Sequence, residues 1–135
     1  MNQYILKDKF ALVTGGARGI GKAIAIRYAQ EGCNVAITGV NEKNVALALE
    51  ELKQYDVKTL GFVSDASDSE EVKKTVNKVI QEFGRIDILV NNAGITKDGL
   101  LIRMTEDQWD TVINVNLKSA FNYINAVLPD RKSVV

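Results

Sequence analysis

One glycine-rich stretch constrains the fold of this chain more than any other feature. Residues 14–21 read Thr-Gly-Gly-Ala-Arg-Gly-Ile-Gly; they follow the apolar run Phe10–Val13 and open a segment with helical periodicity, Ile20–Gln30. Glycine lets the backbone turn tightly and leaves no β-carbon in the path of a pyrophosphate. A helix that begins here directs unpaired N–H groups and about half a positive charge toward such a group. The stretch therefore predicts a nucleotide-binding α/β domain.

Composition narrows the class of protein further. The 135 residues are 46% apolar and 25% charged, as in ordinary globular domains, and 17 basic residues balance 17 acidic ones. The zero net charge favours neither nucleic acid nor an anionic membrane as a partner. No apolar run is long enough for a signal peptide or a membrane span. We therefore expect a soluble cytoplasmic protein.

Cysteine and histidine usage excludes several kinds of site. The single cysteine, Cys33, has no partner for an internal disulfide, which fits a reducing compartment. The chain contains no histidine, so a Ser-His-Asp triad, a Cys-His pair and a histidine-ligated metal are all excluded. We expect no metal site.

From residue 10 onward, short apolar runs alternate with longer segments of helical periodicity. The strands are expected at Phe10–Thr14, Asn34–Thr38, Thr59–Ser64 and Ile86–Asn91. Nearly every residue in these runs is apolar, as expected for parallel strands that helices cover on both faces.

Four helices are expected between and after the strands. The first two are Ile20–Gln30, with Ile20, Ala23, Ile24 and Tyr28 on one side, and Glu42–Gln54. The third starts at a capping box, Ser67-x-x-Glu70, and ends at Gly84. The last starts at Thr105-x-x-Gln108 and Pro129 stops it; its apolar stripe comprises Trp109, Val112, Ile113, Leu117, Ala120, Phe121, Ile124 and Leu128.

Repeated strand–helix units imply right-handed crossovers and a parallel sheet. We expect a Rossmann-like three-layer α/β/α fold with strand order 3-2-1-4 and ligands at the carboxyl ends of the strands. Residues 1–135 carry no linker and no repeat, so they are expected to form one dinucleotide-binding domain.

Four motifs together closely resemble the short-chain dehydrogenase/reductase family. They are Thr-Gly-x-x-x-Gly-x-Gly at 14–21, Asp65 after the third strand, Asn-Asn-Ala-Gly at 91–94 and Asn-Val-Asn-Leu at 114–117. The segment from Asn91 to Phe121, which includes Ile95–Met104, is especially similar to 3-oxoacyl-acyl-carrier-protein reductases. The resemblance implies hydride transfer from NADPH to a 3-ketoacyl thioester carried on acyl carrier protein.

The resemblance also implies which residues bind the dinucleotide. They are Gly15, Ala17, Arg18, Gly19, Ile20, Gly21, Asp65, Ala66, Asn92, Ala93 and Gly94. Each motif has a plainer interpretation as well. The glycines can serve only tight packing of helix on strand, Arg18 can be a solvated side chain, and Asp65 can simply cap a turn.

NADP is favoured over NAD. In the family position, Arg18 stands beside the adenosine ribose, where its guanidinium can pair with a 2′-phosphate. The second strand ends Thr38-Gly39-Val40-Asn41, without the carboxylate that binds ribose hydroxyls in NAD-preferring relatives. Val40 lacks the second basic group of some NADP enzymes, so the expected preference is modest.

Asn116 is the one catalytic position of the family that this chain carries. The resemblance implies that it orders a water and positions the active-site lysine; the alternative is a hydrogen bond at a helix kink. The family's serine and Tyr-x-x-x-Lys are absent, because Asp8, Gly32, Thr59 and Val127 follow four residues after Tyr4, Tyr28, Tyr55 and Tyr123.

We therefore expect a C-terminally truncated fragment that lacks the later strands of the family and is inactive alone. The alternative is a non-catalytic dinucleotide-binding or interaction module. Residues 131–135 fit either the start of a fifth strand or a tail. Loss of the neighbours of the fourth strand predicts an exposed sheet edge and an uncovered helix face, and hence self-association through that strand or the helix Thr105–Leu128.

Overall fold

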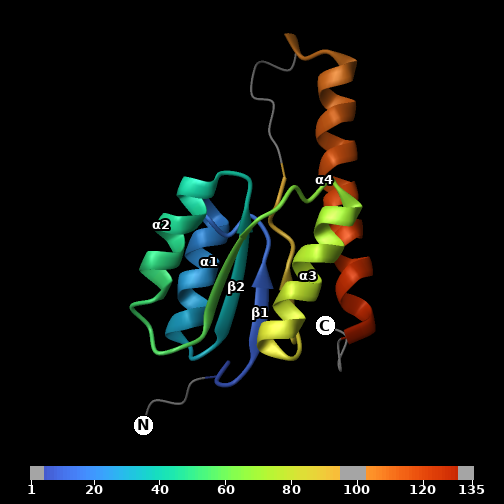
Figure 1. The fold of residues 1–135 in the computed structure, drawn as a ribbon. Helices are drawn as coiled ribbons and strands as arrows, with labels where there is room; N and C mark the ends of the chain where they lie inside the picture. Colours follow the sequence, from blue (N-terminus) through green and yellow to red (C-terminus); the bar gives the residue numbers. More distant parts are fainter. Residues whose placement is uncertain (1–4, 95–102, 131–135) are drawn as a thin grey trace.

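A parallel sheet forms the centre of the fold in a computed structural model that describes residues 5–94 and 103–130 (Figure 1). In chain order the elements are β1 (Phe10–Val13), α1 (Gly19–Gln30), β2 (Asn34–Gly39), α2 (Glu42–Leu52), β3 (Thr59–Val63), α3 (Ser69–Phe83), β4 (Ile88–Val90), α4 (Glu106–Val127) and the 3-10 turn η2 (Leu128–Asp130). The sheet order is β3-β2-β1-β4, and every pair is parallel. The predicted α/β class and strand order are thus confirmed.

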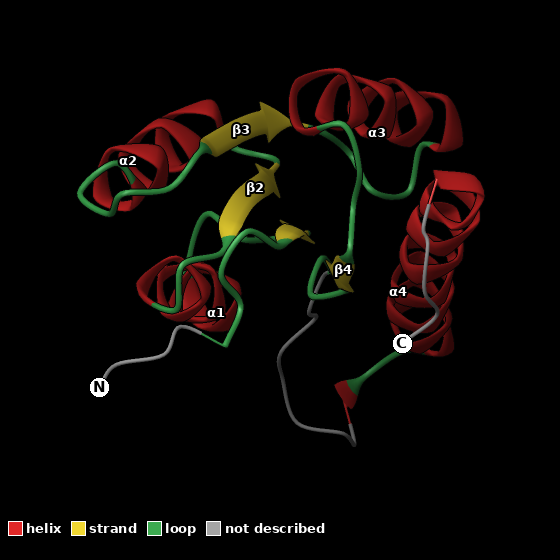
Figure 2. Cartoon of the chain, turned by 90° about the horizontal axis from the view of Figure 1, so that it is seen from below, coloured by secondary structure: helices red, strands yellow, loops and turns green. Residues whose placement is uncertain are grey.

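Two apolar cores lie on opposite faces of the sheet, because successive strand residues point to opposite sides. Ala11 and Val13 of β1 face α1 and α2, whereas Leu12 between them faces α3 and α4. Figure 2 shows the two helix pairs separated by the sheet. The sheet therefore has a helix layer on each side, as the expected three-layer fold requires.

Helix α1 packs through small residues and through part of the predicted apolar side, because Ile24 and Tyr28 are partly buried against the core. Its buried residues are Gly21, Ala25 and Ala29, whereas Ile20 is 75% exposed and Ala23 is also exposed. The predicted side was therefore right at Ile24 and Tyr28 and wrong at Ile20 and Ala23. A face of glycine and alanine lets the helix axis lie close to the strands, which larger side chains would prevent.

The caps of the later helices were predicted in part. The N-cap of α3 is Asp68, whose carboxylate accepts the N–H groups of Glu70 and Glu71 at 3.1 and 3.2 Å. The predicted capping box at Ser67 is therefore wrong, because Ser67 donates to Asp65 instead. The left-handed end at Gly84 (φ 85°) and the capping box of Thr105 with Gln108 are both confirmed.

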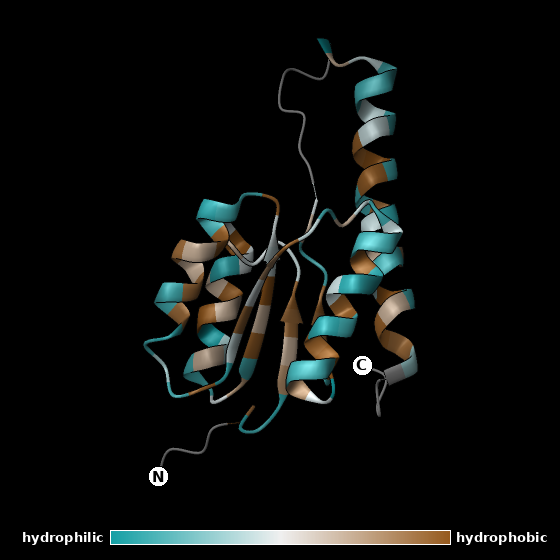
Figure 3. Ribbon diagram, in the orientation of Figure 1, coloured by the Kyte–Doolittle hydropathy of each residue, from teal (hydrophilic) through white to brown (hydrophobic). Residues whose placement is uncertain are grey.

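Helix α4 packs on α3 through a narrow face, and its predicted apolar stripe lies outside that contact. The buried residues of α4 are Ser119, Asn122, Tyr123 and Val127. Trp109, Leu117 and Phe121 are 55%, 67% and 65% exposed. Figure 3 shows apolar bands along the helix, and Figure 1 shows its N-terminal half extending beyond the other described elements. The helix face is thus uncovered, as expected, whereas the β4 edge is only three residues long.

Candidate functional site

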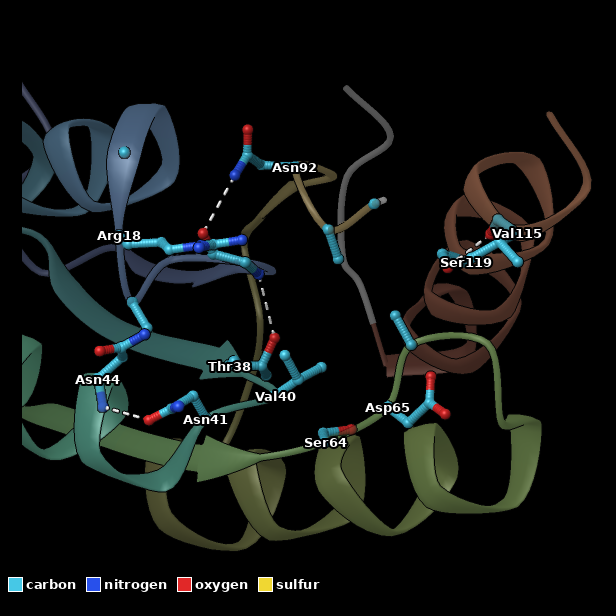
Figure 4. Close-up of a pocket in the computed structure, with 17 residues that line it drawn as sticks. Arg18, Thr38, Val40, Asn41, Asn44, Ser64, Asp65, Asn92, Val115 and Ser119 are labelled. Carbon is cyan, nitrogen blue, oxygen red and sulfur yellow. Dashed lines mark hydrogen bonds between the residues drawn. The ribbon is translucent and has the colours of Figure 1, made fainter. Parts of the chain in front are cut away.

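The carboxyl ends of the strands surround a cavity of about 640 Å³, which is within the size range of small-molecule sites. Figure 4 shows the side chains that line it. They come from the turn after β1, the ends of β2 and β3, the segment after β4 and one face of α4: Gly15, Ala17, Arg18, Gly19, Thr38, Gly39, Val40, Asn41, Asn44, Ser64, Asp65, Ala66, Asn92, Ala93, Gly94, Val115 and Ser119.

The turn after β1 requires glycine at two positions. Gly15 has a φ of +64°, and a β-carbon there would lie 3.1 Å from the backbone of Ala93. Gly21, on the first turn of α1, faces the Gly15 carbonyl so closely that a β-carbon would clash with it. The glycines therefore serve close packing, as the plainer interpretation holds, and the same packing leaves the turn's backbone open toward the cavity.

Two side chains fasten this turn to the segment after β4. Thr14 is 1% exposed, and its hydroxyl oxygen accepts the N–H groups of Asn92 and Ala93 at 3.0 and 2.9 Å. In return, the Asn92 side chain donates its Nδ2–H to the Gly15 carbonyl at 3.1 Å (Figure 4). The segment after β4 is thus hydrogen-bonded directly to the glycine turn.

The N-terminus of α1 differs in charge from those of the other described α-helices. Helices α2, α3 and α4 carry acidic residues in their first turns, which neutralise the positive end of each helix dipole. Helix α1 has none there, and its N-cap, Arg18, makes no side-chain capping bond. The positive end of α1 beside the cavity therefore remains available to an anionic group.

Charge is sparse in the cavity. Among the lining residues that the structure describes, Arg18 is the only base and Asp65 the only acid. The end of β2 contributes Thr38, Gly39 and Val40, without a carboxylate, and the Asn41 side chain accepts the Asn44 N–H at 3.0 Å to cap α2. The described residues at the end of β2 therefore present no carboxylate to the cavity.

Asp65 caps a turn and also lines the cavity. Its Oδ1 accepts the Ser67 hydroxyl at 2.7 Å and the Ser67 N–H at 3.0 Å. These bonds lower the pKa of the exposed Asp65 carboxyl, so it is ionised at neutral pH. Its neighbour Ala66 is buried, and the Ala66 carbonyl accepts the Asn122 Nδ2–H of α4 at 3.0 Å. The turn-capping role proposed from sequence is real, and it fixes where the carboxylate lies.

Asn116 lies beside the cavity rather than in its lining. A β-carbon on Gly94 would be 2.7 Å from Asn116 Oδ1, so the amide of α4 lies directly against the backbone after β4. Ile20 and Gly21 also lie outside the lining, which contains the other predicted binding residues. The segment Ile95–Met104 that carries the acyl-carrier resemblance lies mostly outside the described residues, as do residues 131–135.

The sequence interpretation missed several polar residues of the site. Thr14, Thr38 and Ser64 are 1%, 1% and 3% exposed, and each stands at or just past the carboxyl end of an apolar strand. Their positions in the sequence could have identified them, because a hydroxyl group buried at the end of a strand needs a hydrogen-bond partner there. Ser119 of α4 had no comparable signal.

The groups that line the cavity suit an anionic dinucleotide better than a metal ion. The glycine turn lines the cavity beside the N-terminus of α1, which is the arrangement that binds a pyrophosphate. Within residues 5–94 and 103–130 no cluster of acidic, cysteine or histidine side chains could hold a metal ion. Across the same residues, every helix is too short or too polar to span a bilayer.

Comparison with known protein families and sequences points to one family. Residues 9–133 match the family model described as short chain dehydrogenase. The 3-oxoacyl-[acyl-carrier-protein] reductase FabG of Thermotoga maritima is 46% identical over 124 residues, which cover 92% of this chain and 50% of the relative. The enzyme of the same name from Staphylococcus epidermidis is 48% identical over 123 residues, 90% of this chain and 50% of the relative. The chain spans about half the length of these relatives.

Solved structures share the fold. A short chain dehydrogenase of Burkholderia cenocepacia in complex with NADP superposes with a TM-score of 0.85 at 37% identity and covers 96% of this chain and 53% of its own. An NAD+-bound xylitol dehydrogenase gives a TM-score of 0.87 at 31% identity, over 93% of this chain and 49% of its own. Structures of this kind therefore include both NADP-bound and NAD-bound proteins.

Proposed function

Because this chain belongs to the short-chain dehydrogenase family, we propose that its cavity binds a nicotinamide dinucleotide and prefers NADP to NAD. One observation carries the proposal: the glycine turn, the α1 N-terminus and the segment after β4 are fastened together around the cavity by Thr14 and Asn92. The first N–H groups of α1, which have no partner within the helix, are the donors proposed for the pyrophosphate.

Different residues of the cavity bind different parts of the dinucleotide in this proposal. The turn at Gly15 to Gly21 holds the pyrophosphate, and Asp65 with the Ala66 backbone holds the adenine. Arg18 pairs with the 2′-phosphate, where a planar guanidinium binds two oxygens at once. Asn92, Ala93 and Gly94 hold the central part of the molecule. When bound, the dinucleotide supplies the hydride for carbonyl reduction.

For the whole protein we propose reduction of a 3-ketoacyl thioester on acyl carrier protein, in the cytoplasm. Its support is the 46–48% identity to the two FabG relatives. The 135 residues contain no Tyr-x-x-x-Lys to donate the proton, and Asn116 alone cannot replace it. The isolated chain is therefore proposed to bind the dinucleotide without reducing a carbonyl.

Isothermal titration of the 135-residue chain with NADPH and NADH tests the binding proposal. We expect one saturable site, with NADPH binding more tightly. A Gly21→Ala variant should lose binding, because its β-carbon meets the Gly15 carbonyl. Absence of heat with both dinucleotides, from a chain whose circular dichroism shows that it is folded, would refute the proposal. Turnover of an acetoacetyl thioester by this chain would refute the proposal that the isolated chain does not reduce a carbonyl.

A second role, self-association, is favoured by the exposed stripe of α4. Six exposed apolar side chains follow the helix at spacings of three and four residues: Trp109, Ile113, Leu117, Phe121, Ile124 and Leu128. An exposed apolar stripe of this length is typical of a helix face that packs against another helix. We propose that two copies pair through it. Light scattering should show a dimer that Leu117→Glu disrupts and Asn125→Glu, on an exposed polar position, does not.

A further inference from the structure

The turn that carries Asp65 into the cavity is held from outside the cavity by a carboxylate of α3. Glu71, in the first turn of α3, accepts the Asp65 N–H on its Oε1 at 3.1 Å. Asp65 lines the cavity (Figure 4), whereas Glu71 is half-buried and lies outside that lining. Glu71 can therefore affect a bound ligand through the turn that it holds or through its charge.

The hydrogen bond to Glu71 differs from the other hydrogen bonds of Asp65 in what it joins. The Asp65 carbonyl accepts the Asp68 N–H at 3.0 Å, and Asp65 Oδ1 accepts the N–H and hydroxyl of Ser67. These bonds close the turn within residues 65–68. The Glu71 bond instead joins the first residue of the turn to a residue inside the helix. It therefore fixes the position of Asp65 relative to α3.

Loss of this bond should loosen the turn without unfolding the domain. A backbone N–H that donates to a carboxylate makes a stronger bond than one to a neutral acceptor. Asp65 is exposed, so water can replace Glu71 as the partner of its N–H, and no buried donor is left unsatisfied. The consequence should therefore appear in the order of the turn more than in the stability of the fold.

The chemistry of adenine makes the position of the Asp65 carboxylate important. The exocyclic amino group of adenine is a hydrogen-bond donor, and an ionised carboxylate only accepts. Both bonds from Ser67 go to Oδ1, so Oδ2 can accept a donor from a ligand. Hypoxanthine carries a carbonyl oxygen in place of the amino group and offers no such donor. A well-placed Asp65 should therefore discriminate adenine from hypoxanthine.

We propose that Glu71 is a positioning residue for the adenine end of the dinucleotide site, acting on the Asp65 carboxylate through the Asp65 N–H. The inference rests on the proposed dinucleotide binding. Glu71 itself contacts no part of the dinucleotide. Its acceptor oxygen, rather than its charge, is what the role requires.

Glu71→Ala and Glu71→Gln test the proposal, because both remove the charge and only glutamine keeps an acceptor oxygen. The 135-residue chain is titrated with NADP+ and with its hypoxanthine analogue. We expect Glu71→Ala to lower NADP+ affinity about threefold to tenfold, the effect of one hydrogen bond, and to leave affinity for the analogue nearly unchanged. Glu71→Gln should keep the wild-type ratio of the two affinities. Glu70→Ala is the matched control, since exposed Glu70 lies in the same helical turn; it should also keep that ratio.

Asp65→Ala provides the second arm of the test. This variant should lose the preference for NADP+ over the analogue. Adding Glu71→Ala to it should change the ratio no further, because both changes act on one carboxylate. If Glu71→Ala does not fold, Glu71→Asp takes its place. Aspartate keeps the charge but is one methylene shorter, which withdraws the carboxylate from the Asp65 N–H, so the ratio should fall as expected for alanine.

The outcomes separate the two proposals. A folded wild-type chain that binds neither ligand refutes the proposed function. A wild-type chain that binds both ligands equally well overturns the role of Glu71 and leaves dinucleotide binding intact. A Glu71→Ala variant with the wild-type ratio overturns the role of Glu71 alone. Equal loss of affinity for both ligands also overturns it, because general loosening of the fold would affect both alike.

Discussion

Replacing Thr14 with valine tests whether one buried hydroxyl holds the glycine turn and the segment after β4 together. The Thr14 hydroxyl oxygen accepts the N–H groups of Asn92 and Ala93 at 3.0 and 2.9 Å. It also donates to the Val90 carbonyl at 3.3 Å. The side chain is 1% exposed, so valine fits the same space without opening a cavity. The substitution therefore removes hydrogen bonds and little else.

The expected cost follows from the two amides that lose their acceptor. An unsatisfied buried donor costs about 1–3 kcal/mol, but Asn92 and Ala93 are only half-buried and water replaces part of the loss. We expect the free energy of unfolding to fall by about 1.5–3 kcal/mol. That is a large share of the roughly 5–15 kcal/mol that stabilises an ordinary domain.

Urea denaturation followed by circular dichroism measures this loss. Thr14→Ser is the control, because it keeps the hydroxyl and removes one methyl group, at a cost of about 1 kcal/mol. The valine variant should be less stable than the serine variant and should bind NADP+ more weakly. A valine variant within about 0.5 kcal/mol of wild type, or more stable than the serine variant, would refute the reasoning.

Three further results are expected. Arg18→Ala should weaken NADP+ binding about tenfold and leave NAD+ binding nearly unchanged. The control variant Arg27→Ala, on the exposed side of α1, should affect the binding of neither dinucleotide. An equal effect of Arg18→Ala on both dinucleotides would contradict the proposed contact of Arg18 with the 2′-phosphate. Cys33 is fully buried with its pKa raised to about 12 by burial, so Ellman's reagent at pH 8 should label it only in urea. The folded-state pKa of Asp65 lies below its ordinary 3.8, so its stabilising effect is present above that value and is lost as the pH falls through the folded pKa. The difference in urea midpoint between wild type and Asp65→Asn should therefore be present at pH 6 and shrink as the pH falls below 3.8. A difference independent of pH would contradict this expectation.

The strands, their order and the glycine turn could be predicted from sequence because each depends on local information. Apolar runs such as Phe10–Val13 are short and flanked by turns, and strand–helix alternation leaves few possible sheet orders. The capping box at Thr105 was predictable for the same reason, since both partners lie within one helical turn. At Ser67 the same pattern failed, because Asp68 is an equally good cap one residue later.

The packing of α4 could not be predicted from its periodicity. A stripe such as Leu117 and Phe121 indicates an apolar face, but the sequence does not say which element covers it. In the described structure α3 instead covers a face with Ser119, Asn122 and Tyr123. The side chains of Asn122 and Tyr123 find hydrogen-bond partners in the segment after β3, at Ala66 and Ser64. Such contacts join residues about sixty positions apart, and no local pattern records them.

The cavity itself was predicted in position and only partly in content. Gly15, Arg18, Asp65 and Asn92 were expected to meet at the carboxyl edge of the sheet, and they do. The hydroxyl groups that fasten these residues were missed, because a threonine at the end of an apolar strand has many possible roles. Their importance emerges only from the distances between elements.

Amide chemical shifts of the isotopically labelled 135-residue chain, recorded during titration with NADP+, test the central claim most directly. Saturable shifts should concentrate in residues 15–21, at Asp65 and Ala66, and in residues 92–94, where the structure places the cavity. NAD+ should move the same amides except that of Arg18, and should do so at higher concentration. Absence of saturable shifts, or shifts confined to the outer faces of α1 and α2, would contradict dinucleotide binding at this site.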